Sequence, residues 1–196
     1  VLDSAISRAS DEILNAVGSG RTPEDLRIPL GSVAVSYPAG VFLGRGHRLA
    51  LSFIHDSIGQ RPIYFASAGG LLRELGLQDW GVRHGIAMKL VMRDLEAEAP
   101  SDLVQGSPEM GGEWFDVDRS MVLVRDIYQY RGIRDREIWQ DRSTLNIPMQ
   151  YQFLFAQLAD AAAISGLPPE EVTKLAEDAA AMRITALGGR RYVEGL

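Results

Sequence analysis

The side chains best suited to chemistry in this sequence are its three histidines, His47, His55 and His84. Metal sites usually take two ligands from one helical turn, or place histidines beside a carboxylate group, and these spacings match neither pattern. Asp56 follows His55, but neighbours on a helix are not expected to face each other. The sequence has no cysteine and no Gly-x-Ser-x-Gly nucleophile elbow. We therefore expect no catalytic residue, no cofactor and no metal.

Tryptophan offers another kind of chemistry, because its ring can stack on a sugar as well as pack in a core. The sequence has three tryptophans, Trp80, Trp114 and Trp139. Aspartate and glutamate are plentiful, but a sequence does not show which of them face each other across a cleft. A glycan site built from tryptophan and aspartate side chains therefore stays open beside the commoner role of these rings in a core or an interface.

Composition and charge exclude several classes of protein. A hydrophobic content of 46% and a charged content of 23% are those of an ordinary globular domain with a real core. The formal net charge of -6 argues against a nucleic-acid partner, because phosphate backbones favour clustered lysine and arginine. No apolar run reaches the roughly 18 residues of a membrane span. An acidic surface is also not expected to insert directly into a bilayer.

The elements that must position these side chains alternate between helix and strand. The segment 61–70, Arg-Pro-Ile-Tyr-Phe-Ala-Ser-Ala-Gly-Gly, predicts a short buried strand that begins after a proline and ends in a glycine turn. We expect Tyr64 to be buried in this strand. A helix over 48–59 precedes it, and 86–92 predicts a further strand. The fold class is therefore α/β, with α+β also possible, built as a small sheet with flanking helices.

The remaining segments carry weaker periodic patterns of apolar residues. We predict a helix over 3–17, a connector over 21–30, a strand over 32–37, a short helix or turn over 79–84, an irregular loop over 94–113 and a helix over 117–130. The connector is predicted because residues 21–30 hold two prolines and little periodicity.

The last third of the chain predicts an antiparallel helical hairpin. Apolar stripes run along 151–162 and 172–186, and Pro-Pro-Glu-Glu at 168–171 begins the second helix with prolines and acidic residues. So short a turn requires the two helices to pack against each other. We expect three parts: an N-terminal helix and connector over 1–27, an α/β domain over 28–144, and a hairpin over 145–196 packed on it.

The motif Arg-Pro-Ile-Tyr-Phe-Ala at 61–66 resembles a strand in a family of large bacterial multi-spanning membrane proteins, which are related to GT-C-type protein O-mannosyltransferases. The resemblance is to their soluble C-terminal region and extends over most of 28–188, including 75–90 and the Asn-Ile-Pro at 146–148. The presumed catalytic acid of that family lies outside this region, so no catalytic residue carries over. The resemblance implies an accessory domain on the extracytoplasmic, periplasmic side of a membrane.

The leading hypothesis is a non-enzymatic interaction domain that docks on an integral membrane protein or complex. A photosynthetic reaction-centre or antenna assembly is one candidate partner. Aromatic and arginine side chains are favoured at interfaces. The candidate interface residues are Trp114, Phe115, Arg134, Trp139 and Arg142. The alternative is a glycan-binding soluble domain of a GT-C-like membrane glycosyltransferase, and an enzyme in its own right is a third hypothesis.

Overall fold

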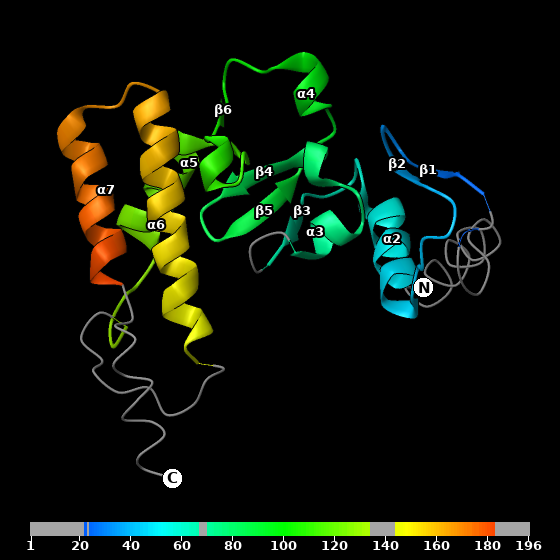
Figure 1. Cartoon of the computed structure of the whole chain (residues 1–196), viewed down its shortest axis with the longest axis horizontal. Helices are drawn as coiled ribbons and strands as arrows, with labels where there is room; N and C mark the ends of the chain where they lie inside the picture. Colours follow the sequence, from blue (N-terminus) through cyan, green and yellow to red (C-terminus); the bar gives the residue numbers. More distant parts are fainter. Residues whose placement is uncertain (1–21, 23, 67–69, 134–143, 183–196) are drawn as a thin grey trace, which may run out of the picture. The chain divides into compact units, whose positions relative to one another are not determined.

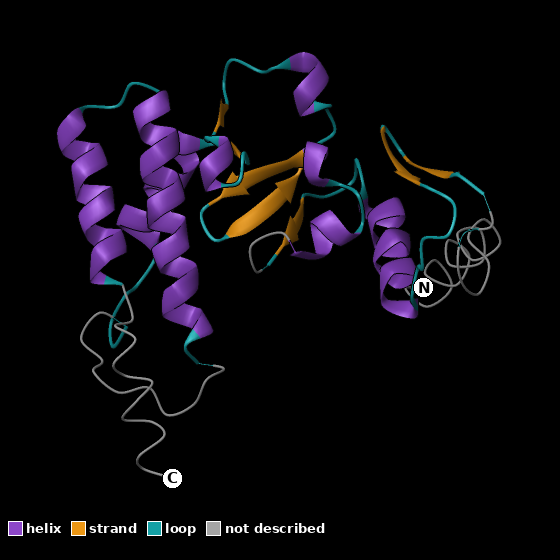
Figure 2. Ribbon diagram, in the orientation of Figure 1, coloured by secondary structure: helices purple, strands orange, loops and turns teal. Residues whose placement is uncertain are grey.

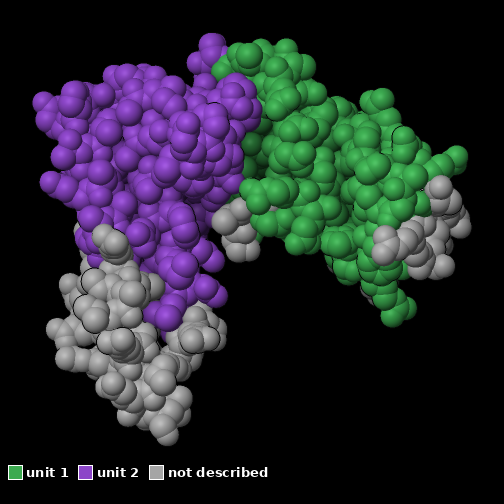
Figure 3. Space-filling model, in the orientation of Figure 1, with its two compact units in different colours: residues 1–82, 87–100 green, residues 83–86, 101–196 purple. Residues whose placement is uncertain are grey.

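The chain combines helices and strands, as Figure 1 and Figure 2 show. The computed structural model describes residues 22, 24–66, 70–133 and 144–182. Two small sheets and a pair of C-terminal helices confirm the mixed fold class and the hairpin predicted from the sequence. The chain divides into two compact units, residues 1–82 with 87–100 (unit 1) and residues 83–86 with 101–196 (unit 2; Figure 3). The predicted domain boundaries stay a prediction.

Unit 1 is built from short elements around one long helix. Its helices and strands are β1 (Leu26–Leu30), β2 (Val33–Tyr37), α2 (Arg45–Ser57), β3 (Ile63–Phe65), α3 (Gly70–Glu74), the 3₁₀ turn η1 (Gln78–Trp80), β5 (Ala87–Leu90) and α4 (Leu95–Glu98). The boundary between the units falls within β4 (Gly81–His84). Strands β1 and β2 form a two-stranded sheet, and the other strands follow the order β3-β5-β4-β7-β6.

Unit 2 is mostly helical. Its other elements are β6 (Val104–Gln105), the 3₁₀ turn η2 (Pro108–Met110), β7 (Trp114–Phe115), α5 (Val117–Val122), the π-helical turn η3 (Leu123–Ile127), α6 (Asn146–Ile164) and α7 (Pro169–Ala181). Helices α6 and α7 lie side by side, and α6 also contacts α5, β6 and η2. The core of this unit gathers Phe115, Leu154, Phe155, Leu158 and Leu175.

Strand β1 corrects the prediction of a connector over 21–30. It pairs antiparallel with β2, and Pro29 lies opposite Ala34 in the ladder. A two-stranded sheet has only edge strands, so one side of β1 needs no hydrogen-bond partner and a proline without an N–H is tolerated there. The inward face of the hairpin supplies Leu30, Val33 and Val35 to the core of unit 1.

Strand β3 corrects the prediction that Tyr64 is buried. Phe65 is 8% exposed, whereas the Tyr64 side chain is 50% exposed. Strand β3 pairs antiparallel with β5, and Tyr64 lies opposite Lys89. Successive side chains of a strand point to opposite faces. Since Ile63, Tyr64 and Phe65 are all apolar or aromatic, the sequence of this short strand does not show which face is buried.

The segment 79–84 also departs in part from its predicted short helix or turn. Only η1 is helical, and the chain then continues as β4, all four residues of which are buried. At the start of β4, Gly81 leaves little room for a side chain, because an added Cβ would lie 3.1 Å from side-chain atoms of both Leu72 and Met88. The predicted irregular loop over 94–113 instead contains α4, β6 and η2.

The helix predicted over 3–17 lies outside the described residues. Within the part of the chain that the structure describes, no helix is both long enough and apolar enough to cross a membrane. The longest helix, α6, has 19 residues and buries one side against α5 and α7.

The two faces of β3 give the first testable prediction. Phe65→Ala should lower the free energy of unfolding by about 3–5 kcal/mol, as truncated core aromatics do, because the ring leaves a cavity. Tyr64→Ala should cost less than about 1 kcal/mol, since half of its side chain already meets water. Urea unfolding followed by circular dichroism measures both. Equal losses in the two variants would contradict the register of β3.

Candidate functional site

Each histidine is held beside a different carboxylate. His47 Nε2 lies 3.1 Å from Glu74, and its Nδ1 accepts the backbone N–H of Gly44 at the start of α2. His55 Nδ1 lies 3.3 Å from Asp56, which corrects the expectation that these neighbours do not meet. In unit 2, the ring of His84 lies 3.4 Å from Asp116. Among the described residues, no group of three or more His, Asp or Glu is arranged to hold a metal ion.

The candidate interface residues fall into three situations. The side chain of Trp114 is half-buried on β7. Phe115 is 1% exposed in the core of unit 2, so it is unavailable to a partner and its candidacy is corrected. The two residues alternate along a short strand, which turns only one of them outward. Arg134, Trp139 and Arg142 lie outside the described residues.

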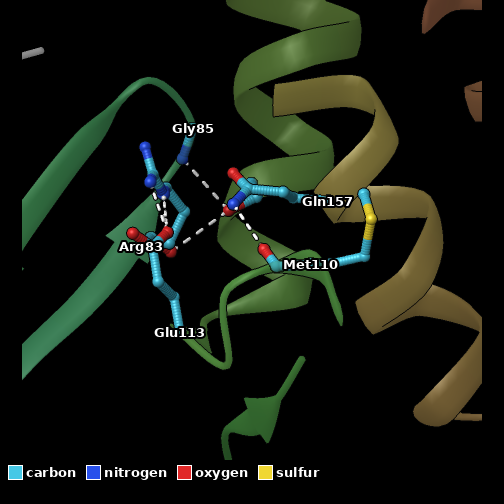
Figure 4. Close-up of polar contacts among 6 residues, drawn as sticks. Arg83, Gly85, Met110, Glu113 and Gln157 are labelled. Atoms are coloured by element: carbon cyan, nitrogen blue, oxygen red, sulfur yellow. Dashed lines mark hydrogen bonds and ion pairs between the residues drawn. The ribbon is translucent and has the colours of Figure 1, made fainter. Parts of the chain in front are cut away.

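Unit 2 contains a buried ion pair that the sequence analysis missed. The Arg83 guanidinium donates hydrogen bonds to the Glu113 carboxylate through Nη2 and, at 3.0 Å, through Nε (Figure 4). Arg83 is only 4% exposed and the Glu113 side chain 14%. A charge so far from water needs a partner with good hydrogen-bond geometry. The pair therefore ties the end of β4 to the segment before β7.

Backbone contacts extend this pair into a polar network. The Ser120 hydroxyl donates to the Arg83 carbonyl at 3.3 Å and accepts the N–H of Gly85 at 3.1 Å. On α6, the Gln157 amide donates to the Met110 carbonyl at 2.8 Å, as Figure 4 shows. Ser120 is fully buried. Each of these polar groups meets a protein partner, so we assign the network a structural role in unit 2.

Unit 1 contains a polar pocket of about 410 Å³. Four different segments line it: the hairpin β1–β2, the turn before η1, η1 itself and the start of α4. The lining residues are Arg27, Ser32, Ala34, Ser36, Gly76, Gln78, Asp79, Trp80 and Asp94. The pocket thus combines one indole ring with amide, hydroxyl, carboxylate and guanidinium groups, which can donate and accept hydrogen bonds.

Two carboxyl groups set the electrostatics of this pocket. Burial raises the pKa of the Asp79 carboxyl, and the nearby negative charge of Asp94 raises it further. Asp94 Oδ1 accepts the backbone N–H groups of Glu96 and Ala97, each at 3.1 Å, and so caps α4. Arg27 supplies the compensating positive charge in the lining. Because these two carboxyl groups would repel an anionic ligand, the pocket better suits a neutral, hydroxyl-rich one.

Sequence reasoning identified only Trp80 among these lining residues. The others come from segments that are far apart in the chain, and no spacing in the sequence signals that Arg27, Asp79 and Asp94 share one pocket. The ring of Trp80 is half-buried and provides the flat apolar surface of the lining. The chemistry available to the pocket is therefore recognition, through stacking and hydrogen bonds.

No family model, no curated protein and no solved structure matches this chain. A function for the chain must therefore be argued from its own residues. We base this argument on side chains of unit 1 that folding leaves exposed or solvated.

The buried ion pair gives the second prediction. Glu113→Ala should lower the free energy of unfolding by about 3–5 kcal/mol, because it leaves the Arg83 charge buried without a partner. Replacing both residues, Arg83→Met with Glu113→Leu, should recover most of that loss. Guanidinium unfolding measures these differences. Glu109→Ala, an exposed residue of the same segment, is the control and should change stability by no more than about 0.5 kcal/mol. Wild-type stability in Glu113→Ala would show that water reaches Arg83.

Proposed function

We propose that this chain is a non-enzymatic accessory subunit, which docks through unit 1 on the extracytoplasmic surface of an integral membrane protein or complex. The observation that carries the proposal is an apolar stripe on α2, formed by Leu49 and Phe53, with a further exposed ring, Phe42, in the segment before the helix. Phe42 is 61% exposed, and Leu49 and Phe53 are each 47% exposed. Large apolar side chains gathered at a surface favour burial against a protein partner.

Helix α2 shows how the stripe arises. Leu51 and Ile54 are buried on one side of the helix, in the core of unit 1. Leu49 and Phe53 are four residues apart, so they lie on one face, and that face is exposed. A helix that only covers a core needs polar residues on its outer face. Phenylalanine and leucine there are unfavourable unless a partner covers them.

Two considerations favour a membrane protein as the partner. Residues 28–188 resemble a domain that is joined to membrane helices in the family of multi-spanning membrane proteins. Protein contacts can hold this chain in the same place. The net charge of -6 disfavours direct adsorption to an anionic bilayer, which attracts basic segments. A photosynthetic reaction-centre or antenna assembly remains one candidate for the complex.

The third prediction tests the apolar stripe in native membranes. Leu49→Ser combined with Phe53→Ser should lower the membrane-bound fraction of the chain at least about tenfold, since two anchors are lost from the interface. Gentle membrane fractionation and immunoblotting measure the bound fraction. Both substitutions are at exposed positions, so the variant should keep its fold by circular dichroism.

The matched control is Ile164→Ser, which also removes one exposed apolar side chain but lies at the end of α6. It should leave the bound fraction unchanged. Full retention of the double variant would place the interface elsewhere. A wild-type chain that is found entirely outside the membrane fraction would contradict the proposed function itself.

A second candidate function, glycan binding, draws support from the polar pocket of unit 1. Its lining offers the Trp80 ring for stacking, and Gln78, Asp79 and Asp94 as groups that can meet sugar hydroxyls. Such a site would suit the soluble domain of a GT-C-like membrane glycosyltransferase. Glycan binding and docking use different residues, so the two functions can be tested separately.

The fourth prediction concerns this pocket. A panel of soluble oligosaccharides of mannose, glucose and N-acetylglucosamine is titrated while the indole N–H signals of the tryptophans are followed by NMR. A bound glycan should shift the Trp80 signal, and Trp80→Ala should weaken binding at least about tenfold through the lost stacking. Trp114→Ala is the matched control and should bind as the wild type does. Absence of any shift across the panel would dismiss glycan binding.

A further inference from the structure

A second hollow of unit 1 has a different chemistry from the polar pocket. It is an open groove of about 590 Å³ where β3 begins and β5 ends. The antiparallel pairing of these strands, with Ile63 opposite Leu90, brings the segments 58–63 and 89–93 together. The side chains that give the groove its character are Ile58, Arg61, Pro62, Lys89, Met92 and Arg93. Three of the six are cationic, and the lining includes no aspartate or glutamate.

This concentration of positive charge is unusual in a protein of net charge -6. Like charges held close together repel each other and favour a bound anion. Among the residues that the structure describes, no carboxylate is paired with Arg61 or Lys89. Folding alone therefore does not account for the position of these two cations.

The end of α2 is a nearby feature that opposes an anion. A helix C-terminus carries roughly half a negative charge on its unpaired carbonyl groups. Here the Ser57 carbonyl accepts the N–H groups of Gln60 and Arg61, at 3.0 and 3.1 Å, and the Ile54 carbonyl accepts that of Ile58. These contacts reduce the exposed negative end, and the positive charges of Arg61 and Lys89 outweigh it.

Strand β3 adds a backbone element to the groove. It lies at one end of the strand order and pairs with β5 alone among the described strands. Every second residue of an edge strand directs its N–H and C=O groups away from the sheet, where an extended chain can pair with them. The groove lies at the start of this free edge, beside Pro62 and Ile63.

We propose that the groove binds an extended acidic segment of the protein partner. Its carboxylates would meet Arg61 and Lys89, and its apolar side chains would contact Ile58, Pro62 and Met92. This inference rests on the proposed function and names the chemistry that the partner presents. The apolar half of the groove fits a peptide better than a nucleic acid, which would demand more cations. The acidic surface of the chain disfavours a lipid headgroup, which would bring the whole anionic bilayer with it.

The fifth prediction tests the groove with a defined probe. A fluorescein-labelled peptide of about ten residues that alternates glutamate and valine is titrated with the full chain, and its anisotropy is measured. The peptide should bind at low salt and bind more weakly as salt is raised, because ions screen the charge pairs. The matching peptide that alternates lysine and valine should not bind.

Two variants locate the site. Arg61→Glu with Lys89→Glu should weaken binding of the acidic peptide at least about tenfold, and Arg61→Gln with Lys89→Gln should weaken it by a smaller factor. Lys174→Glu, which changes an exposed cation of α7, is the matched control and should bind normally. Circular dichroism checks that each variant is folded. Unchanged binding in both double variants would overturn the inference.

The remaining outcomes separate this inference from the proposed function. A wild-type chain that is retained on native membranes but does not bind the acidic peptide would overturn the groove inference alone. A chain that binds the peptide through the groove but is absent from membranes would overturn the proposed function and leave the groove assigned. Stronger binding to vesicles of anionic lipid than to the peptide would assign the groove to a lipid headgroup instead, and so overturn the inference.

Discussion

The buried ion pair between Arg83 and Glu113 is the constraint on which the structure of unit 2 depends. A guanidinium placed where almost no water reaches it must be paired, because an isolated charge there costs several kcal/mol. Satisfying it requires the segment before β7 to lie against the end of β4. That placement in turn brings the Asp116 N–H within 3.2 Å of the Arg83 carbonyl and lets α5 begin beside it. The helices of this unit then cover a continuous apolar core.

Unit 1 differs from unit 2, because its proposed function rests on the side chains that folding leaves exposed. Its core is closed by the inward faces of β1, β2, α2 and β3. Phe42, Leu49 and Phe53 contribute little to that core, and Arg61 and Lys89 have no ion-pair partner among the described residues. Exposed apolar side chains and cationic grooves are features that protein interfaces use, with the apolar side chains supplying affinity and the charges supplying orientation.

The parts of the fold that the sequence predicted are those in which local pattern and tertiary packing agree. Helices α6 and α7 carry long apolar stripes, and the prolines before α7 mark its start, so both were predicted. Tyr64 was misplaced because a three-residue strand of apolar side chains shows no alternation. The partners Arg83 and Glu113 are 30 positions apart, and nothing local links them. The polar pocket and the groove likewise join distant segments, so neither could be read from spacing.

We propose that unit 1 docks on an integral membrane protein through its apolar stripe and that an acidic segment of this partner binds in the groove. The chain offers a direct test, because its only lysines are Lys89, in the groove, and Lys174, on α7. A zero-length carbodiimide joins a lysine amine only to a carboxylate in direct contact with it. Applied to native membranes and read by mass spectrometry, it should join Lys89 to an aspartate or glutamate of an integral membrane protein. Cross-links to such a protein from Lys174 alone, or none from Lys89, would contradict the account.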